Sequence, residues 1–568
     1  MNTYTQYAAA SGHPLATKAA IAILEEGGNA IDAGVAAGMA LGVLHCELVN
    51  FAGVAPIMIR SAQKSETVTI DGLGGWPAAA TTAFFEESFD GAIPEGILRT
   101  VVPAAPAAWI RALRDYGTIS FGEAARFAIE YARDGFEVYE LFAEVIAASE
   151  ADFRRTPESA KIYLPNGRPP HVGERFIQTD LAASIQYVAD EESAAGGDRL
   201  AGLQAAHDAF YKGDIARKIC DHHRANNGFL ALEDLANYQV RYEQPLRVSF
   251  GDFEIVTCGA WCQGISLAQA FSMLDASSLA AMGQNSSAYI HHLTEVFKLV
   301  FADREHYVAD PLFVDVPVAD MLAADYLAAR RSLIRPDLAW PDLPPPGDPC
   351  ARQATLSDTT STQASRVENP SSALDTSYLC VIDGEGNVFS ATPSDTASTG
   401  EVIPGTGLCP SSRGSQSRGV STSINALMPG KRPRLTPNPA IALRNGEPFM
   451  AFGTPGGDVQ IQAMIQVFAN HACFGMPLDE AIAAPRFATY SFPSSFAPNE
   501  HFPGLLKFEP GIDQDVASEL TRRGHDVQWW PRRDWHAGGV CAVQVESTEP
   551  RRLKAAADPR RAGTADGL

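Results

Sequence analysis

The chain has 568 residues, of which 46% are hydrophobic and 20% charged, and its formal net charge is −23. These values are typical of a globular protein with two to four domains and an ample core. They argue against a nucleic-acid partner, because an acidic chain with no Lys/Arg-rich run repels phosphate.

The cysteines and the N-terminal segment indicate the cellular compartment in which the protein is expected. Nine scattered cysteines are sparse and odd in number, which predicts reduced thiols in a cytoplasmic protein. Cys258 and Cys262 form a lone C-x3-C with no second pair at zinc spacing, so no metal is expected there. The first twenty residues lack the basic start and apolar core of a signal peptide. The most apolar stretch, "AIDAGVAAGMALGVLHC", is too short and too rich in Gly and Ala to cross a bilayer.

The first 330 residues are predicted to be mostly helical. Residues 13–44 read as two Ala-rich helices broken at Gly27-Gly28-Asn29. Residues 55–74 alternate as a hairpin does. Residues 121–138 have apolar positions at helical spacing and end their helix at Gly135, and residues 287–311 form another amphipathic helix stopped by Pro311.

The composition and the predicted secondary structure change twice after residue 330. Residues 335–374 are rich in Pro, Ser, Thr and Asp and are predicted to be a loop, in part disordered. From Thr376 onward strands dominate: strand–turn–strand over 377–392, then a second hairpin over 439–454 with Asn445-Gly446 as a type I′ turn. Helices over 458–472 and 477–485 follow. We see no internal repeat, and the whole predicts an α+β layered protein.

Thr376 stands where the ragged segment meets the first strand. An internal threonine is a poor nucleophile, but a threonine at a chain N-terminus carries its own base, an α-amine with a pKa of about 7.7–8.0. Reaching that state requires cleavage of the Asp375–Thr376 bond, a step that the Thr376 hydroxyl itself could carry out. The structural alternative is simple, because strands often begin with Thr and Asp-Thr is common at turns.

A Gly-rich turn supports the catalytic interpretation. "FMAFGTPGGDVQIQAMIQVF" reads as strand, turn, helix, which places Gly456 and Gly457 at a helix N-terminus. Free backbone N–H groups there can bind an anion or an oxyanion. A plain tight turn or a phosphate site would look similar, although the ending and spacing of nucleotide loops are absent.

With these motifs in hand, the chain resembles the γ-glutamyltransferase (γ-glutamyltranspeptidase) family of N-terminal-nucleophile hydrolases. The likeness runs from "HPLATKAAIAILEEGGNAIDAGVAAGMAL" through "GFLALEDLANYQV" and "FADREHYVADP" to "TSYLCVIDGEGNVFSAT", "GTPGGD", "APRF" and "DPRR". The resemblance implies a four-layer αββα sandwich, made as one precursor. It also implies self-cleavage into a large subunit, residues 1–375 with a linker tail at about 335–375, and a small subunit, residues 376–568.

The resemblance also assigns catalytic roles. Thr376 falls on the nucleophile, and Gly456 and Gly457 fall on the oxyanion-hole pair. Ser394 falls where the family usually has a second threonine that steadies the nucleophile's amine. Tyr378 replaces the family's usual histidine two residues after the nucleophile, a change that the sequence does not explain.

In the family, a set of residues binds the glutamate part of the substrate, and this chain has different residues at those positions. Leu73 stands where the family has an arginine for the substrate α-carboxylate, and Leu435-Thr436 replace a Ser-Ser pair that shares that carboxylate. The Asn and Asp that grip the α-amino group fall near Thr396 and Gln416. Without buried opposite charges, an α-ammonium and an α-carboxylate would be desolvated unpaired. The lid segment before "KRP" is also expected to be shorter.

Other residues have two interpretations each. Arg413 and Arg434 could meet a carboxylate elsewhere on a substrate, or could be solvated at the surface. Trp261 and Gln263 could shape the acyl pocket, with loop packing as the alternative, and His45 and Cys46 could approach the site. A metal site at His291, His292 and Glu295 is less expected than a solvated helix face.

The sequence therefore predicts an autoprocessed Thr-nucleophile amidohydrolase or acyltransferase that acts on a small amide other than the ordinary γ-glutamyl one, without cofactor or metal. Its partners would be a small-molecule substrate and the two subunits of one precursor, with a further homodimer open. The alternatives are a true γ-glutamyltransferase or glutathione hydrolase, an uncleaved non-catalytic binding protein, and cleavage of a C–C bond in a keto acid.

Overall fold

The computed structural model describes residues 2–354 and 376–568. Asp375 and the last part of the predicted linker, residues 355–375, lie outside the described residues. Residues 335–354 form turns and short bridges without a helix or a strand, and they pack on the body: the Trp340 N–H donates to Glu295 at 2.9 Å and the Tyr307 hydroxyl donates to the Gly347 carbonyl at 2.7 Å.

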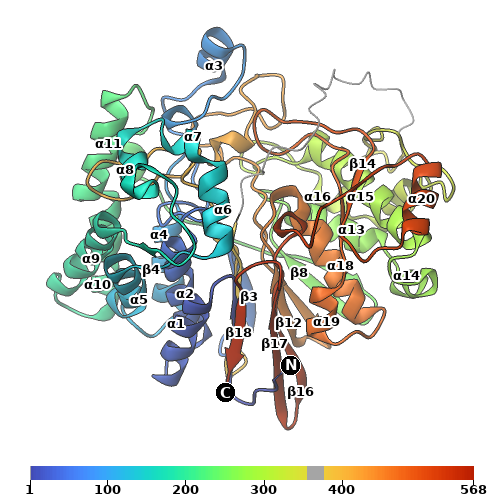
Figure 1. Cartoon of the computed structure of the whole chain (residues 1–568), viewed down its shortest axis with the longest axis horizontal. Coiled ribbons are helices and arrows are strands. Elements are labelled where there is room, and N and C mark those ends of the chain that lie inside the picture. Colours follow the sequence, from blue (N-terminus) through green and yellow to red (C-terminus); the bar gives the residue numbers. More distant parts are fainter. Residues whose placement is uncertain (1, 355–375) are drawn as a thin grey trace.

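Two antiparallel sheets face each other at the centre of the molecule (Figure 1). The first sheet has seven strands in the order β18 (Thr564–Gly567), β1 (Ala8–Ser11), β9 (Leu379–Ile382), β10 (Val388–Ala391), β2 (Ile57–Ser61), β3 (Glu66–Ile70), β6 (Tyr242–Glu243). The second sheet has six, in the order β17 (Arg551–Ala557), β16 (Cys541–Thr548), β12 (Glu447–Gly453), β11 (Ala440–Arg444), β8 (Phe253–Thr257), β7 (Leu246–Phe250).

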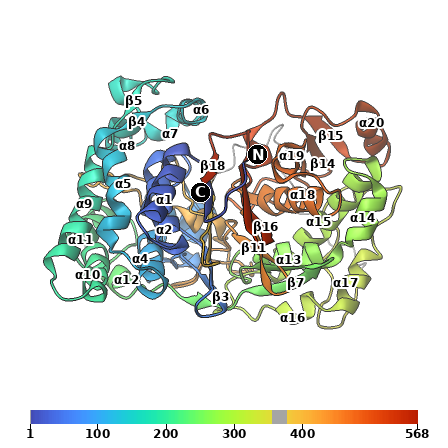
Figure 2. The same cartoon turned by 90° about the horizontal axis from the view of Figure 1, so that it is seen from below.

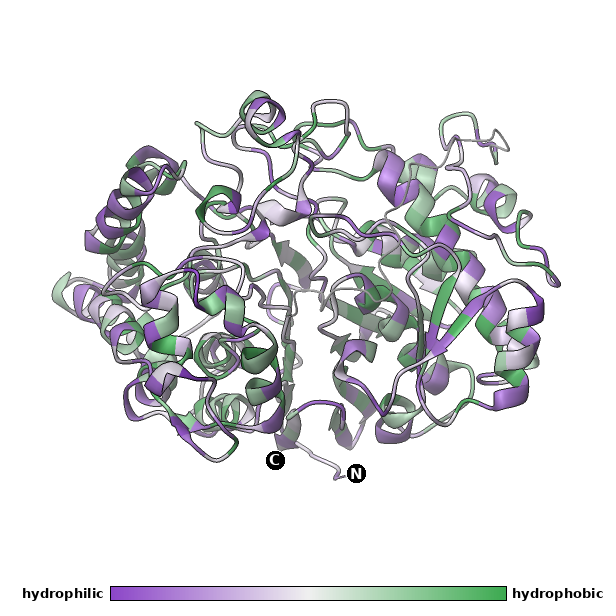
Figure 3. Cartoon of the chain, turned by 45° about the horizontal axis from the view of Figure 1, so that its top comes forward, coloured by the Kyte–Doolittle hydropathy of each residue, from purple (hydrophilic) through white to green (hydrophobic). Residues whose placement is uncertain are grey.

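An apolar layer joins the inner faces of the two sheets. Ala10, Cys380 and Ile382 from the first sheet lie in one buried cluster with Val256 and Ile441, among others, from the second. Because successive strand side chains alternate between faces, the opposite face of each sheet is left to the helices. Figure 3 shows this pattern as apolar central strands surrounded by helices with polar outer surfaces.

Helices cover the outer face of each sheet, so the fold is an αββα sandwich, as expected (Figure 2). The seven-stranded sheet is covered by α1 (Pro14–Glu25), α2 (Ala30–Leu44), α4 (Ala105–Tyr116), α5 (Phe121–Asp134), α9 (Thr179–Ala194), α10 (Arg199–Tyr211), α11 (Asp214–Ala225) and α12 (Leu232–Ala236). The six-stranded sheet is covered by α13 (Gly264–Met273), α14 (Ala276–Met282), α15 (Ser287–Tyr307), α16 (Val318–Met321), α17 (Ala324–Arg331), α18 (Gln460–Ala472), α19 (Leu478–Ala483) and α20 (Gln514–Arg522).

Smaller elements surround the open end of the sandwich. They are α3 (Thr82–Phe89), α6 (Glu140–Ala148), α7 (Glu150–Phe153) and α8 (Pro157–Tyr163), a two-stranded sheet of β4 (Phe136–Glu137) and β5 (Arg175–Phe176), and a three-stranded sheet of β13 (Phe487–Thr489), β14 (Leu505–Phe508) and β15 (Asp526–Trp529). None of the helices in the described ranges combines the length and apolar character that crossing a membrane requires.

Several local predictions are confirmed. The break at Gly27-Gly28-Asn29 separates α1 from α2, and Asn29 caps α2 through a capping box with Asp32. Asn445 and Gly446 both have positive φ, 54° and 81°, as a type I′ turn requires, and they connect β11 to β12.

Both sheets contain strands from either side of the predicted cleavage point. Strands β9, β10 and β18 share the first sheet with β1, β2, β3 and β6, while β7 and β8 share the second with β11 and its neighbours. Sheet hydrogen bonds such as those between β1 and β9 cross from one part to the other. Two fragments produced by a cut before Thr376 would therefore stay joined.

Candidate active site

Thr376 lies at the end of the seven-stranded sheet, just ahead of β9. It forms an isolated antiparallel bridge with Ser394, and the Ser377 N–H donates to the Pro393 carbonyl at 3.0 Å. The regular ladder begins only at Leu379, two residues later than the sequence predicts. Pro393 explains the delay, because it has no N–H to donate to a ladder. The backbone of Thr376 thus pairs with that of Ser394 ahead of the regular ladder.

A chain of polar side chains leads from Thr376 into the interior. Thr376 Oγ1 lies 2.6 Å from Ser394 Oγ, and the Arg413 guanidinium donates to the same Ser394 oxygen. Arg413 is only 1% exposed, so surface solvation is the wrong interpretation for this residue. The Arg413 guanidinium therefore contacts Ser394, the hydroxyl partner of Thr376.

Asp395 is the last of the polar side chains that lead inward from Thr376, and the sequence analysis did not identify it. Arg413 Nε lies 3.7 Å from the carboxylate, which also accepts hydrogen bonds from the Ser411 hydroxyl at 2.6 Å and the Ser412 hydroxyl at 2.8 Å. Burial raises the pKa of Asp395, although Arg413 and the two serines oppose the shift. Its φ of 118° is rare for a residue with a side chain, and such strain is concentrated at functional sites. The only sequence signal was its place directly after Ser394.

The Gly-Gly turn lies where the sequence placed it, between β12 and α18. Gly456 has φ 124° and Gly457 has φ 54°, and a short 3₁₀ turn over Gly457–Val459 leads into the helix. The first N–H groups of such a helical segment have no intrahelical acceptor, so they can bind an oxyanion.

Tyr378 packs the strand that precedes the Gly-Gly turn against the segment that carries Thr376. A Cβ atom built on Gly453 would lie 2.3 Å from the Tyr378 ring, so β12 and β9 touch three residues before Gly456 and two residues after Thr376. The Tyr378 hydroxyl lies 2.7 Å from the Ser390 hydroxyl, and the ring is fully buried. The tyrosine at this position therefore packs between the sheets.

A cavity of about 420 Å³ adjoins this end of the sandwich. Thr396 and Gly456 line it from the catalytic side, and Tyr490, Phe492 and Phe496 give it an aromatic wall. Arg413 lies behind that wall, with its guanidinium carbon 5.4 Å from the centre of the Phe496 ring. Arg99, only 3% exposed, also lines the cavity, and its side chain donates to the carbonyls of Ile93 and Pro94. A small molecule can thus reach the Gly-Gly turn.

The predicted substrate-reading residues fall into two groups. Thr396 lines the cavity, and the Gln416 amide donates to the Thr436 hydroxyl at 3.0 Å and lies 3.4 Å from Arg413, so these polar groups adjoin the nucleophile's network. Leu73 and Trp261, by contrast, are buried in the apolar layer between the sheets together with Leu435.

Arg434 is also remote from the nucleophile's network. It is 1% exposed, and its guanidinium lies 2.5 Å from Glu305, in a cluster with Arg304 and Arg418. Surface solvation is again the wrong interpretation. The Gln263 amide donates to Asp458 at 3.1 Å, which connects its loop to the Gly-Gly turn.

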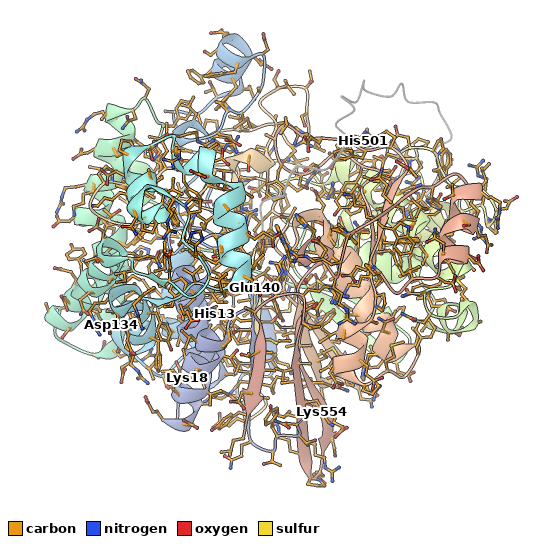
Figure 4. All side chains as sticks on the ribbon, viewed as in Figure 1. His13, Lys18, Asp134, Glu140, His501 and Lys554 are labelled. Carbon is orange, nitrogen blue, oxygen red and sulfur yellow. The ribbon has the colours of Figure 1, made fainter. Side chains whose placement is uncertain are left out.

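His45, which belongs to the predicted large subunit, lies near the residue that follows Thr376, as the sequence suggested. A Cβ atom on Gly12 would lie 2.4 Å from Ser377 Oγ and 3.0 Å from His45 Cε1, so Gly12 separates the two. Burial keeps the pKa of His45 well below its usual value, which leaves the ring neutral, and burial raises the pKa of the Cys46 thiol. The ring of Tyr139, which precedes Glu140, lies 5.2 Å from that of His13, where Figure 4 shows the foot of α6 beside His13.

The buried trio His291, Glu295 and His525 could hold a metal ion by distance, within the ranges that the structure describes. His291 and Glu295 are buried, so the expectation of a solvated helix face is wrong. The trio is engaged internally: His291 Nδ1 lies 2.8 Å from His525 Nε2, and Lys298 forms an ion pair with Glu295 at 2.8 Å. That ammonium group would repel a metal cation.

Comparison with known proteins places these features in context. The family model described as gamma-glutamyltranspeptidase matches residues 16–568. The acylase ACY 1 proenzyme of Pseudomonas sp. (strain V22) is 31% identical over 546 residues, covering 94% of this chain and 88% of that protein. The glutathione hydrolase proenzyme of Bacillus subtilis (strain 168) is 29% identical over 569 residues, covering 98% of this chain and 91% of that protein.

Solved structures agree over the whole length. LmbA2991HD has a TM-score of 0.92 and 35% identity, covering 100% of this chain and 99% of that one. The cephalosporin acylase from Bacillus halodurans has a TM-score of 0.84 and 25% identity, covering 100% of this chain and 96% of that one.

Proposed function

Because the chain belongs to the γ-glutamyltranspeptidase family of N-terminal-nucleophile hydrolases, we propose that it is an autoprocessed threonine amidohydrolase in which Thr376 is the nucleophile. The observation that carries the proposal is the contact of Thr376 Oγ1 with Ser394 Oγ at 2.6 Å, backed by Arg413. A scaffold that serves only for binding has no need to bury a threonine against a serine–arginine pair next to a Gly-Gly turn.

The proposed reaction starts from a precursor. The Thr376 hydroxyl attacks the Asp375 carbonyl, and the Asp375–Thr376 amide bond breaks as the acyl group moves to Oγ1, which frees the α-amine of Thr376. Water then hydrolyses the ester, which releases the Asp375 carboxylate and restores the Thr376 hydroxyl. This amine then takes the hydroxyl proton as Oγ1 attacks the substrate amide carbonyl. The N–H groups of Gly456 and Gly457 stabilise the oxyanion, the proton passes to the leaving amine, and water hydrolyses the acyl-enzyme.

The substrate is proposed to be a small amide other than the ordinary γ-glutamyl one. The candidate reading positions near the nucleophile carry neutral side chains, namely Thr396, Gln416 and Thr436, and Leu73 is in the core. None of these three side chains offers a carboxylate to an α-ammonium group. The aromatic wall of Tyr490, Phe492 and Phe496 suits an apolar or aromatic part of the substrate.

A second candidate is γ-glutamyl transfer or glutathione hydrolysis, and Arg99 is the observation that favours it. Its guanidinium lines the cavity and could meet a substrate carboxylate, and a glutathione hydrolase proenzyme is among the relatives. Arg99 would then replace the arginine missing at Leu73.

A panel of p-nitroanilides with one leaving group separates these candidates. It should contain γ-glutamyl, glutaryl, phenylacetyl and hexanoyl groups, tested on the wild type and on Thr376→Ala. Turnover of the acyl groups that lack an α-amine, with the γ-glutamyl compound at least tenfold slower, supports the proposal. A preference for the γ-glutamyl compound that Arg99→Met abolishes supports the second candidate. Equal rates in the wild type and Thr376→Ala would leave only a binding role.

A further inference from the structure

We infer that Arg413 is a positioning residue that acts through Ser394: it orients the Thr376 hydroxyl and keeps the α-amine of cleaved Thr376 unprotonated near neutral pH. The inference rests on the proposed function, because this amine exists only once the Asp375–Thr376 bond has been cut. It differs from the sequence-based expectation, in which Arg413 would meet a substrate carboxylate.

The direction of the hydrogen bonds is the first argument. An arginine side chain has donors and no acceptor, so Ser394 Oγ must accept from Arg413. Ser394 Oγ lies 2.6 Å from Thr376 Oγ1, so the Ser394 hydroxyl can donate to that oxygen. With its oxygen already accepting, the Thr376 hydroxyl can turn its own proton toward the α-amine on the same residue. That is the arrangement in which the amine acts as base.

Charge is the second argument. A guanidinium stays protonated at any pH at which the protein folds, so it is a fixed cation. A cation within a few ångströms disfavours the charged form of an amine and lowers its pKa by about one to three units. Thr376 and Ser394 are 0% exposed, and Arg413 is 1% exposed, so water screens this interaction little. With its pKa lowered in this way, the α-amine of cleaved Thr376 is unprotonated at neutral pH.

Other charged and titratable groups face the site, and all but Asp395 are neutral or paired with a group other than Arg413. Asp395 opposes Arg413 in sign and lies 3.7 Å from its Nε; Ser411 and Ser412 also donate to this carboxylate, and burial raises its pKa. Two histidines from neighbouring elements, His45 and His13, are kept neutral by burial, which lowers their pKa. The charged groups there are engaged by other residues: Glu47 accepts from Tyr139 at 2.5 Å, and Asp458 pairs with Arg304 at 2.5 Å. Arg561 donates to the Trp535 carbonyl. Arg413 is the charged group that donates directly to Ser394, the hydroxyl partner of Thr376.

The test measures the titration of the amine directly. Purified full-length protein is labelled with trace acetic anhydride across pH 5–10, and mass spectrometry follows acetylation of the Thr376 N-terminal peptide. The variants are Arg413→Gln, Arg413→Lys and, as a matched control, Arg434→Gln, which removes an equally buried arginine that is paired with Glu305. The acid limb of kcat/KM against pH is recorded in parallel.

Arg413→Gln should move the midpoint of the amine titration and the acid limb upward by about one pH unit, because loss of the cation raises the pKa of the amine. Arg413→Lys keeps the charge and should stay within a few tenths of the wild type. Arg434→Gln should leave the midpoint in place even if its activity falls.

Two failures can be told apart. An uncut wild-type chain would overturn the proposed function, and the inference with it. A correctly cut chain in which Arg413→Gln titrates as the wild type does would overturn the inference alone. If Arg413→Gln does not fold, the double variant Arg413→Gln/Asp395→Asn removes the buried pair together. The reference for the double variant is Asp395→Asn alone. A higher midpoint in the double variant than in Asp395→Asn supports the inference, and equal midpoints overturn it.

Discussion

Asp458 Oδ1 lies 2.5 Å from Arg304 Nη1, and this buried ion pair ties the Gly-Gly turn to helix α15. Asp458 directly follows Gly457, and its carboxylate also accepts from the Gln263 amide at 3.1 Å and the Ser495 hydroxyl at 2.7 Å. Three segments that are distant in sequence thus fix the position of the turn. Side chains that are held in this way are what a preorganised oxyanion site requires.

Replacing the charge of Asp458 should therefore affect catalysis more than substrate binding. Asp458→Asn keeps the shape but leaves Arg304 without its carboxylate. We expect kcat to fall about 10- to 100-fold with little change in KM, because the turn makes its contacts in the transition state. Steady-state kinetics on the best anilide gives both constants.

The matched control is Asp303→Asn. Asp303 forms a similarly buried pair with Arg330, at 3.0 Å, on the same helix but away from the turn. Both variants should lose about 3–5 kcal/mol of unfolding free energy, the usual effect of breaking a buried pair. Equal losses of kcat in the two variants would show that Asp458 acts on global stability only.

The backbone conformation of Gly456 gives a second prediction. A Cβ atom there would lie 3.6 Å from Gly538 Cα, so there is room for one, but φ is 124° and residues with a side chain rarely adopt this value. Gly456→Ala should turn the N–H away from the oxyanion and lower kcat by about 10²–10³-fold. Gly446→Ala is the control, because Gly446 also has positive φ (81°) and lies in the exposed β11–β12 turn. That variant should cost about 1 kcal/mol of stability and leave kcat unchanged.

A third prediction concerns pH and stability. Burial of Glu305 would raise its pKa, but the guanidinium groups of Arg434, Arg304 and Arg418 outweigh burial and lower the pKa to about 2, from an ordinary 4.5. Between those values the unfolded chain binds more protons than the folded one. The contribution of Glu305 is therefore fully present above pH 4.5 and is lost as pH falls toward 2. The shift corresponds to about 3 kcal/mol.

Urea unfolding at pH 7, 4.5 and 3 checks this prediction. Glu305→Gln should be less stable than the wild type by about 3 kcal/mol at pH 7, and the gap should narrow steadily at the two lower values. Glu87→Gln, which removes an exposed carboxylate from α3, should show no such gap. A difference between wild type and Glu305→Gln that stays constant with pH would exclude the linkage.

Much of this architecture could be predicted from sequence because its signals are local. The helix break at Gly27-Gly28-Asn29, the Asn445-Gly446 turn and the Gly-Gly turn depend on residues a few positions apart. Tertiary contacts were beyond reach. Asp395 and Arg413 meet because Asp395 adopts a positive φ that no pattern announces, and Arg434 is buried because Glu305, 129 positions earlier, lies beside it.

Burial by distant parts of the chain overturned one sequence-based expectation and bears on two further residues. The periodicity of α15 indicated one solvated face, but the chain at Arg335–Trp340 and His525 cover that face, so His291 and Glu295 are inside. Leu73 stands where the family has a substrate-binding arginine, and Trp261 could either shape the acyl pocket or pack in its loop. Their apolar side chains instead fill the layer between the sheets, where burial stabilises them.

The intact mass of the purified protein, measured beside Thr376→Ala, tests the identity of the nucleophile most directly. Self-cleavage by Thr376 predicts two fragments in the wild type, one ending at Asp375 and the other beginning at Thr376, and a single chain in the variant. A single chain in the wild type, or the same two fragments in Thr376→Ala, would contradict the role of Thr376.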